Sequence, residues 1–157
     1  MKIRVGFGFD VHQLKKGADF WLGGIIIPHD KGAVGYSDAD VLIHAICDAI
    51  LGAAGLGDIG EWFPDNEPKN KGVDSRKILK KIISEIKTRG LVVHQIDATV
   101  ICEEPRITPH KEKMKEILAL ETNCSLVNIK ATTTEKLGSI GRKEGIAAMA
   151  SVSLLCE

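Results

Sequence analysis

Apolar residues recur every three or four positions in two long segments, residues 38–57 and residues 74–89. In the first segment they cover two flanks of a helix, and in the second they form one face opposite a face of lysines. Ser37 or Asp38 is placed to cap the first helix, and Gly90 to end the second. Thr108 and Pro109 resemble a cap followed by proline at the first helical position, so a third helix is expected from there to about residue 122.

β-Branched and aromatic residues concentrate in other segments, which we expect to be strands. These segments are residues 3–11, 20–27, 91–102, 127–132 and 145–155. Glycines interrupt the first, as in a strand whose backbone approaches another group closely, and small residues dominate the last. Residues 58–72 are rich in glycine, proline, aspartate and asparagine, a composition that favours a mobile surface loop.

The order of these elements is strand, strand, helix, helix, strand, helix, strand, strand. It predicts an α+β fold, a sandwich in which helices cover one face of a mixed β-sheet. The chain has 157 residues and no internal repeat, and this length is typical of one ordinary domain. We therefore expect residues 1–157 to form a single domain.

Charge is balanced, with 21 lysine and arginine residues against 21 aspartate and glutamate residues. Proteins that bind nucleic-acid backbones usually carry a positive surplus or a basic stripe, so no nucleic-acid partner is expected. A small phosphorylated ligand remains compatible with this composition. Hydrophobic residues make up 44% of the chain, as in a folded protein rather than a disordered one.

No apolar run approaches the roughly 20 residues of a membrane span, so no membrane partner is expected. A strand-like pattern begins at the N-terminus without a signal-like segment, which favours a cytoplasmic location. Cys47, Cys102, Cys124 and Cys156 are far apart and form no C-x-x-C pair, so we expect reduced, mostly buried thiols.

A candidate metal site combines two segments of the chain. Asp10 and His12 lie two positions apart in an expected strand, so their side chains leave the same face, while His44 lies in the first expected helix. Together they would form a zinc site with an open fourth position, which is typical of a catalytic metal. Asp40 and Asp48, four residues before and after His44, are candidates to orient it. The alternative is structural, because a lone helical histidine is more often a satisfied core or surface residue.

A second candidate site follows the strand expected at residues 127–132. Residues 131–138 read A-T-T-T-E-K-L-G, and Gly141 and Arg142 come shortly after. Threonine hydroxyls and backbone N–H groups at a strand end can bind phosphate oxygens, Glu135 can hold a magnesium ion, and Lys136 or Arg142 can offset negative charge. The alternative is a polar loop in which threonine is present only for its β-propensity.

A third candidate is the loop at residues 57–65, which reads G-D-I-G-E-W-F-P-D. Its carboxylates flank aromatic side chains, so they can accept hydrogen bonds from ribose or polyol hydroxyls while the aromatic rings exclude water. A solvated acidic turn explains the same residues equally well.

Taken together, four motifs fall in the order and spacing of one family. They are G-F-D-V-H at residues 8–12, S-D-A-D-V-L-I-H at residues 37–44, G-D-I-G-E-W-F-P-D at residues 57–65 and K-A-T-T-T-E-K-L-G at residues 130–138. The chain resembles the 2-C-methyl-D-erythritol 2,4-cyclodiphosphate synthase family of the non-mevalonate isoprenoid pathway, from about residue 6 to residue 155. Four separated motifs are far more specific than any one of them.

The resemblance implies a homotrimer with active sites at the subunit interfaces. It also implies a reaction in which 4-diphosphocytidyl-2-C-methyl-D-erythritol 2-phosphate yields CMP and 2-C-methyl-D-erythritol 2,4-cyclodiphosphate, through attack of the 2-phosphate on the β-phosphorus. A phosphate monoester is already largely dianionic near neutral pH, so the absence of an obvious Ser-His-Asp or Cys-His set is expected. An isoprenoid diphosphate is a further candidate ligand, in the central cavity of the trimer.

The resemblance also assigns roles to residues. Asp10, His12 and His44 would hold zinc or another divalent transition metal, and Glu135 would hold magnesium or manganese. Thr133 and Tyr36 match catalytic positions. Asp58 and Gly60 match contacts to the ribose, Asp65 a contact to the methylerythritol part, and residues 102–108 the cytosine pocket. The full substrate-binding set is Asp10, His12, Tyr36, Ser37, Asp58, Gly60, Phe63, Asp65, Cys102, Pro105, Arg106, Ile107, Thr108, Thr132, Thr133, Glu135, Ser139 and Arg142.

Two positions depart from the family pattern. Tyr36 stands where the family usually carries histidine, and a phenol donates one hydrogen bond but has no positive charge at neutral pH. Ser139 replaces a common aromatic residue near the trimer axis, which would loosen an apolar ligand site there. Two other readings therefore stay open: a metal-dependent phosphohydrolase that uses the same site to activate water, and a nucleotide-binding or isoprenoid-sensing trimer with weak catalysis.

Overall fold

The first strand shows how the sheet and the helices meet. The computed structural model describes residues 2–156, and within it β1 runs over Ile3–Lys16. Gly6 and Gly8 face α1 (Val41–Ala54) so closely that a methyl group on either would overlap a backbone carbonyl oxygen of that helix, at Ala49 or Ala45. Glycine at these positions therefore lets the helix lie directly against the strand.

The five-stranded sheet has the order β4-β1-β7-β5-β6. The strands are β4 (Lys31–Val34), β7 (Gly145–Cys156), β5 (Leu91–Ile101) and β6 (Val127–Thr132), in addition to β1. β5 and β6 are parallel, and the other neighbours are antiparallel. The expectation of a mixed sheet is confirmed.

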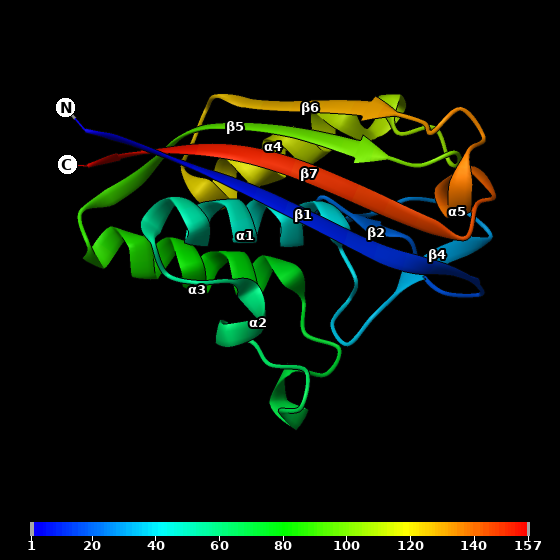
Figure 1. Ribbon diagram of the computed structural model, residues 1–157, viewed down its shortest axis with the longest axis horizontal. Coiled ribbons are helices and arrows are strands. Elements are labelled where there is room, and N and C mark those ends of the chain that lie inside the picture. The colour runs from blue at the N-terminus through cyan, green and yellow to red at the C-terminus, as the bar shows by residue number, and fades with distance from the viewer. Residues whose placement is uncertain (1, 157) are drawn as a thin grey trace.

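Three long helices pack on one side of the sheet (Figure 1). α1 lies against β1 and β7, α3 (Ser75–Thr88) packs on α1 and β5, and α4 (Lys111–Thr122) packs on β6 and α3. The amphipathic pattern of residues 74–89 is confirmed, since α3 buries Ile78, Leu79, Ile82 and Ile86. The expected α+β layering, with helices on one face only, is therefore what the structure shows.

The cap expected for α1 was assigned to the wrong residue. Asp40, not Ser37 or Asp38, is the N-cap, and its carboxylate accepts a hydrogen bond from Ile43 N at 3.0 Å. The same carboxylate also accepts hydrogen bonds from Gly23 N and Gly24 N at 2.9 and 2.8 Å. It is fully buried, so it joins the helix start to a distant turn while satisfying buried donors.

Residues 20–27 form a hairpin rather than the expected single strand. β2 (Trp21–Leu22) pairs with β3 (Ile25–Ile26), and the chain reverses at Gly23 and Gly24, which both have positive φ. The alternation of apolar residues spans the turn, and two adjacent glycines provide the backbone freedom for it. The four-residue strand β4 was not predicted, since it is too short to show a pattern.

Two further expectations need correction. The segment expected to be a mobile loop, residues 58–72, contains the short helix α2 (Ile59–Trp62) and the 3-10 turn η1 (Pro68–Asn70). Thr108 makes no side-chain cap, because Thr108–His110 form a separate 3-10 turn, η2, directly before α4. A last short helix, α5 (Gly138–Gly141), follows the threonine run.

Within residues 2–156, no helix covers the side of the sheet opposite α1, α3 and α4 (Figure 1). Successive side chains of β1 alternate between the two faces, so the odd-numbered positions point away from α1. Large apolar residues of β1 and β7 are exposed there: Ile3, Val5, Phe7, Phe9, Val11 and Met149. We call this set of exposed apolar residues the bare sheet face. No helix within residues 2–156 has the length and apolar character needed to cross a membrane.

Candidate metal centre and substrate cavities

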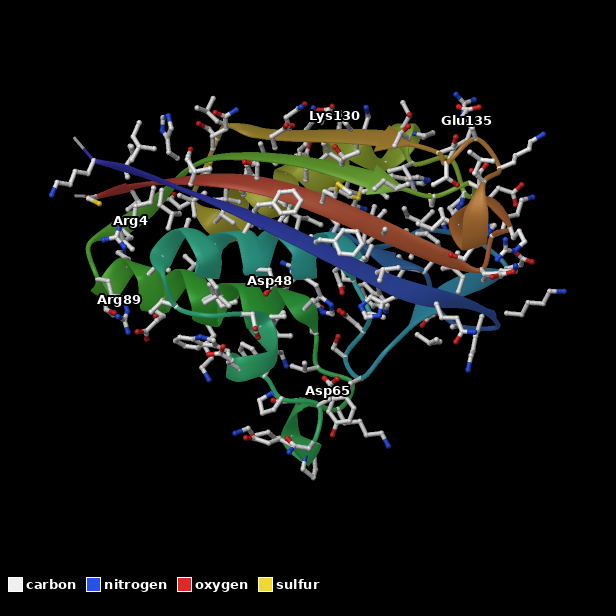
Figure 2. All side chains as sticks on the ribbon, viewed as in Figure 1. Arg4, Asp48, Asp65, Arg89, Lys130 and Glu135 are labelled. Atoms are coloured by element: carbon white, nitrogen blue, oxygen red, sulfur yellow. The ribbon has the colours of Figure 1, made fainter. Side chains whose placement is uncertain are left out.

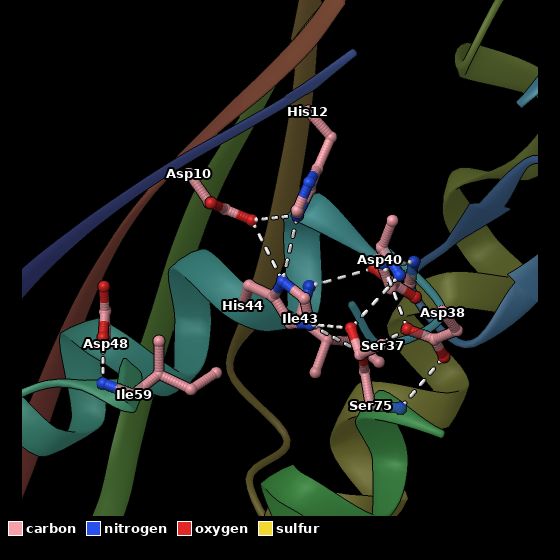
Figure 3. A network of polar contacts seen from close by, with 12 residues as sticks. Asp10, His12, Ser37, Asp38, Asp40, Ile43, His44, Asp48, Ile59 and Ser75 are labelled. Atoms are coloured by element: carbon pink, nitrogen blue, oxygen red, sulfur yellow. Dashed lines mark hydrogen bonds and ion pairs between the residues drawn. The ribbon is translucent and has the colours of Figure 1, made fainter. Parts of the chain in front are cut away.

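Asp10, His12 and His44 converge on one point between the sheet and α1 (Figure 3). Asp10 and His12 occupy even-numbered positions of β1, on the side that faces the helices, and His44 lies in the first turn of α1. Asp10 Oδ2 lies 2.8 Å from His12 Nε2 and 3.0 Å from His44 Nδ1, and the two nitrogen atoms are 3.2 Å apart. One oxygen and two nitrogen atoms thus form a nearly equilateral triangle.

This triangle fits a divalent transition metal. Tetrahedral coordination with bonds of about 2.1 Å places neighbouring ligand atoms roughly 3.4 Å apart, close to the separations of these three atoms. Two imidazoles and one carboxylate match zinc, and three protein ligands leave a coordination position for a substrate oxygen. The donor set and its geometry therefore fit zinc or a similar divalent transition metal.

The charges of the cluster are strongly coupled. Burial alone would raise the pKa of Asp10, but hydrogen bonds and electrostatic attraction from His12 and His44 outweigh it and lower that pKa to about 2. Burial would likewise lower the pKa of His44, yet the hydrogen bond and charge of Asp10 raise it. In the metal-free protein the carboxylate is therefore charged and stabilises a proton on His44, at the position a metal cation would take.

This coupling sets the pH dependence of metal binding. Ligand atoms bind a metal only when unprotonated, and the raised pKa of His44 lets protons compete at higher pH than at an ordinary imidazole. We expect zinc affinity to fall as the pH drops below about 7, with no contribution to that fall from Asp10, which stays ionised. Chelator competition between about pH 5 and pH 8 measures this. An affinity that stays constant over the range would contradict the assignment of His44 as a ligand.

The groups that orient His44 are not the expected ones. Neither Asp40 nor Asp48 contacts its ring, since Asp40 caps α1 and Asp48 Oδ1 accepts a hydrogen bond from Ile59 N at 2.7 Å. His44 Nε2 instead lies 3.0 Å from Ser37 Oγ and 2.9 Å from Ser75 Oγ (Figure 3). Ser75 was not singled out from the sequence, because only the packing of α3 against α1 brings it to the histidine.

A cavity of about 360 Å³ opens beside the metal cluster. The cluster forms one wall, and the loop between α1 and α3 forms another. The expected site residues that line it are Asp10, His12, Tyr36, Ser37, His44, Gly60, Phe63 and Asp65. Buried Asn70 lines it as well and was not predicted; its side chain donates a hydrogen bond to Pro64 O at 3.0 Å and so orders the loop.

Tyr36 and Asp58 hold the loop that borders this cavity. The Tyr36 hydroxyl donates a hydrogen bond to Glu67 O at 3.0 Å, and Gly72 N donates one to Tyr36 O at 2.7 Å. Asp58 is the N-cap of α2, where its carboxylate accepts a hydrogen bond from Glu61 N at 3.0 Å. Asp58 does not line the cavity but lies next to Ile59 and Gly60, which do.

A second cavity, of about 160 Å³, lies at the ends of β5 and β6. Its lining contains these expected site residues: Cys102, Pro105, Arg106, Ile107, Thr108, Thr132 and Thr133. Burial raises the pKa of Cys102 to about 12, so its thiol is neutral at physiological pH. This pocket thus combines a neutral thiol, backbone groups and threonine hydroxyls.

Glu103 orders the threonine run beside the second cavity. Its Oε1 accepts hydrogen bonds from Thr134 N at 3.0 Å and Lys136 N at 3.2 Å. Glu135 N in turn donates to Thr133 Oγ1 at 3.1 Å. Glu103 was part of the expected pocket segment but had no role assigned, since its effect depends on a contact between distant loops.

Four expected site residues line neither cavity: Asp58, Glu135, Ser139 and Arg142. Arg142 is paired with Glu144, its Nε 2.8 Å from Glu144 Oε1. Glu135 lies near α5, far from Asp65 in the loop bordering the first cavity (Figure 2). β7 and β5 separate β1, which carries the metal ligands, from β6, which carries the threonines. Within one chain the expected residues therefore form two separate groups.

Comparisons with known proteins agree on one family. The family model described as "YgbB family" matches residues 3–155. The 2-C-methyl-D-erythritol 2,4-cyclodiphosphate synthase of Bacteroides fragilis is 54% identical over 154 residues, covering 97% of each chain.

Solved structures give the same result. The bifunctional IspDF of Campylobacter jejuni has a TM-score of 0.93 at 42% identity, covering 98% of this chain and 42% of that longer one. A 2C-methyl-D-erythritol-2,4-cyclodiphosphate synthase in its CDP-bound form has a TM-score of 0.89 at 32% identity, covering 97% of this chain and 100% of the other. The family model and the close relatives each span nearly the whole chain, so the chain belongs to the YgbB family, as an enzyme of the 2-C-methyl-D-erythritol 2,4-cyclodiphosphate synthase type in isoprenoid biosynthesis.

Proposed function

We propose that this chain, as a single domain of residues 1–157, converts 4-diphosphocytidyl-2-C-methyl-D-erythritol 2-phosphate into 2-C-methyl-D-erythritol 2,4-cyclodiphosphate and CMP by metal-assisted intramolecular attack. The observation that carries the proposal is the triangle of Asp10, His12 and His44, which opens onto a cavity large enough for part of a nucleotide-linked substrate. In a member of this family, such a cluster favours phosphoryl transfer over a purely structural role.

The reaction needs positioning and charge neutralisation more than a strong base. An oxygen of the 2-phosphate bonds to the β-phosphorus, the bond from that phosphorus to the oxygen bridging the α-phosphate breaks, and CMP leaves with its electron pair. A zinc ion held by Asp10, His12 and His44, and a magnesium or manganese ion held in part by Glu135, would neutralise phosphate charge and polarise the reacting oxygens.

The remaining residues bind and orient the substrate. In the first cavity, Ser37 offers a hydroxyl, and Phe63 and Asp65 contact the methylerythritol part. Gly60 in the lining and Asp58 beside it bind the ribose. In the second, residues 102–108 bind the cytosine, and Thr132 and Thr133 donate hydrogen bonds to phosphate oxygens, with Thr133 stabilising the transition state. Ser139 and Arg142 lie further out, where Arg142 offers a positive charge to a phosphate or to an isoprenoid diphosphate near a threefold axis.

Tyr36 acts without a charge of its own. Its ring lines the first cavity while its hydroxyl is engaged with Glu67 O, so we assign it to substrate contact through the ring and to holding the loop. Since a phenol is neutral at physiological pH, the charge that histidine would bring at this position has to come from the metals, while Thr133 adds a hydrogen bond.

The two cavities form one active site only if copies of the chain assemble. The metal ligands and the threonine run are separated within a chain, and the bare sheet face offers an apolar surface for association. We infer a homotrimer in which the first cavity of one copy meets the second cavity of its neighbour. The assembly then completes three identical sites.

A charged substitution on the bare sheet face tests the proposed homotrimer. Phe7 is 65% exposed on β1, and Phe7→Glu would place a carboxylate in the trimer contact. We expect monomers and a loss of CMP formation of about 100-fold or more, because an unpaired charge cannot be buried there. Leu120→Glu on α4, at a residue 77% exposed, is the matched control and should leave both unchanged. Analytical ultracentrifugation and CMP release measure the two effects, and an active Phe7→Glu monomer would contradict the shared site.

Solvent isotope labelling tests the intramolecular step. In water enriched in oxygen-18, intramolecular attack gives CMP and a cyclic diphosphate that contain no solvent oxygen. A phosphohydrolase using the same site would place one solvent oxygen in a linear product, which mass spectrometry detects. Incorporation of solvent oxygen into the initial products would overturn the cyclisation proposal.

A binding protein with weak catalysis is the second candidate, and Tyr36 is the observation that favours it. Such a protein would bind CDP in the presence of metal and form no CMP from the substrate. Comparing CMP release by the native protein and by Tyr36→His separates the two. Turnover by the native protein supports the synthase, whereas turnover only after Tyr36→His supports the binding role.

A further inference from the structure

We propose that Ser75 is a positioning residue for the metal centre, fixing the His44 ring in the tautomer that presents its Nδ1 lone pair to a metal bound between Asp10 and His12. This inference rests on the proposed metal site. It assigns a role to a residue that contacts neither the substrate nor the metal position.

Ser75 is buried, so its hydroxyl can form hydrogen bonds only with neighbouring groups of the protein. Ser75 is the first residue of α3 and is 0% exposed, and His44 is 8% exposed. Ser75 Oγ donates a short hydrogen bond to Asp38 Oδ1 and lies 2.9 Å from His44 Nε2. Because water does not reach this hydroxyl, its partners must come from the protein.

The direction of these bonds follows from the number of protons. A hydroxyl has one proton, and Ser75 gives it to the Asp38 carboxylate, which can only accept when ionised. The contact with His44 Nε2 must then be one in which the ring donates and Ser75 Oγ accepts. A neutral imidazole with its proton on Nε2 has its lone pair on Nδ1, the atom that points into the metal cluster.

Asp38 is itself held firmly in place. Its carboxylate also accepts hydrogen bonds from Ser75 N at 2.9 Å and Asp40 N at 3.1 Å. The acceptor end of the chain of bonds is thus fixed by two backbone groups, one in α3 and one before α1. The orientation of the metal ligand therefore depends on the packing of α3 against the start of α1.

Ser37 does not perform the same task. Its Oγ lies 3.0 Å from His44 Nε2 and accepts a hydrogen bond from Ala39 N at 3.2 Å, but no carboxylate among the described contacts takes its proton. Ser37 can therefore donate or accept, and it lines the first cavity where substrate binds. Only Ser75 has a fixed direction and so specifies the tautomer.

Zinc affinity measures the consequence. With Ser75→Ala we expect zinc to bind ~10–100-fold more weakly in chelator competition, the range typical for loss of a group that orients a metal ligand. Asp74→Ala is the matched control, because Asp74 caps the same helix through Arg76 N at 2.8 Å without a contact to His44. It should weaken the start of α3 yet change zinc affinity by less than about two-fold.

The tautomer itself gives a readout that a merely structural role would not move. Nitrogen-15 NMR of the His44 ring in the zinc-loaded native protein should show zinc on Nδ1 and the proton on Nε2. In Asp38→Asn the amide donates to Ser75 Oγ, and the serine turns its proton toward Nε2. The ring can then keep its own proton only on Nδ1, so zinc should bind more weakly than to the native protein.

Zinc affinity and the His44 tautomer test this proposal independently of catalysis. A zinc-loaded native His44 ring that carries its proton on Nδ1, or a Ser75→Ala protein that binds zinc within about two-fold of the native affinity, would overturn it. The NMR result on the native protein is decisive even if a variant does not fold. Failure of the proposed reaction would appear in product formation alone and would leave zinc affinity and the tautomer as expected.

Discussion

His44→Ala should lower CMP formation by about 10³-fold or more, the largest effect expected for any single substitution in this chain. The substitution removes one of three protein ligands and leaves Asp10 with only one of the two histidines that stabilise its charge. It also leaves the Ser75 hydroxyl without its donor inside the protein. Loss of bound zinc should therefore accompany the loss of activity.

Two measurements make this prediction specific. Metal analysis of the purified variant should show zinc far below one ion per chain, and circular dichroism should show that the sheet persists. His94→Ala is the matched control, since His94 is exposed on β5 and lines neither cavity. Undiminished CMP release by His44→Ala would contradict a metal held by these three residues.

Gly8→Ala should cost about 3 kcal/mol of unfolding free energy, the largest stability effect expected. The added methyl group would overlap the backbone carbonyl oxygen of Ala45 in α1. Neither group can move away by rotation of a side chain. The helix and strand must therefore separate. Because Asp10 and His12 are on this strand and His44 is on this helix, zinc affinity should fall as well.

Gly52→Ala is the matched control for Gly8→Ala. Gly52 lies within α1, and its nearest potential contact is Phe7 O at 4.0 Å, so a methyl group fits. We expect a gain of up to about 1 kcal/mol, because alanine favours the helix. Urea unfolding of both variants at equal protein concentration measures the difference, since assembly makes stability concentration-dependent. Equal stability of the two variants would contradict the close approach of β1 and α1.

The elements predicted well were those with long, regular patterns. α3 shows an apolar face over four turns, and β6 coincides with the predicted residues 127–132. The hairpin of β2 and β3 was missed because the apolar pattern of residues 20–27 continues through Gly23 and Gly24. Local spacing cannot show whether a pair of glycines bends a strand or reverses it.

The contacts in the metal site also divide into those that residue spacing predicted and those that it did not. The two-residue spacing of Asp10 and His12 in a strand gave their common direction, and His44 joins them because the tight contact at Gly6 and Gly8 brings α1 to that strand. Ser75 and Asp38 could not be assigned to His44 from spacing, since their contact depends on how α3 packs. Asp40 and Asp48 have helical spacing from His44, but their carboxylates accept hydrogen bonds from backbone N–H groups instead.

A metal ion held by Asp10, His12 and His44 should be required for formation of the cyclic diphosphate. The most direct test is phosphorus NMR of the native protein incubated with 4-diphosphocytidyl-2-C-methyl-D-erythritol 2-phosphate and magnesium, first after removal of zinc by a chelator and then after zinc is restored. We expect CMP and a cyclic diphosphate only with zinc restored, and no inorganic phosphate. Equal turnover without zinc, linear products, or no turnover by a folded, zinc-loaded protein would contradict it.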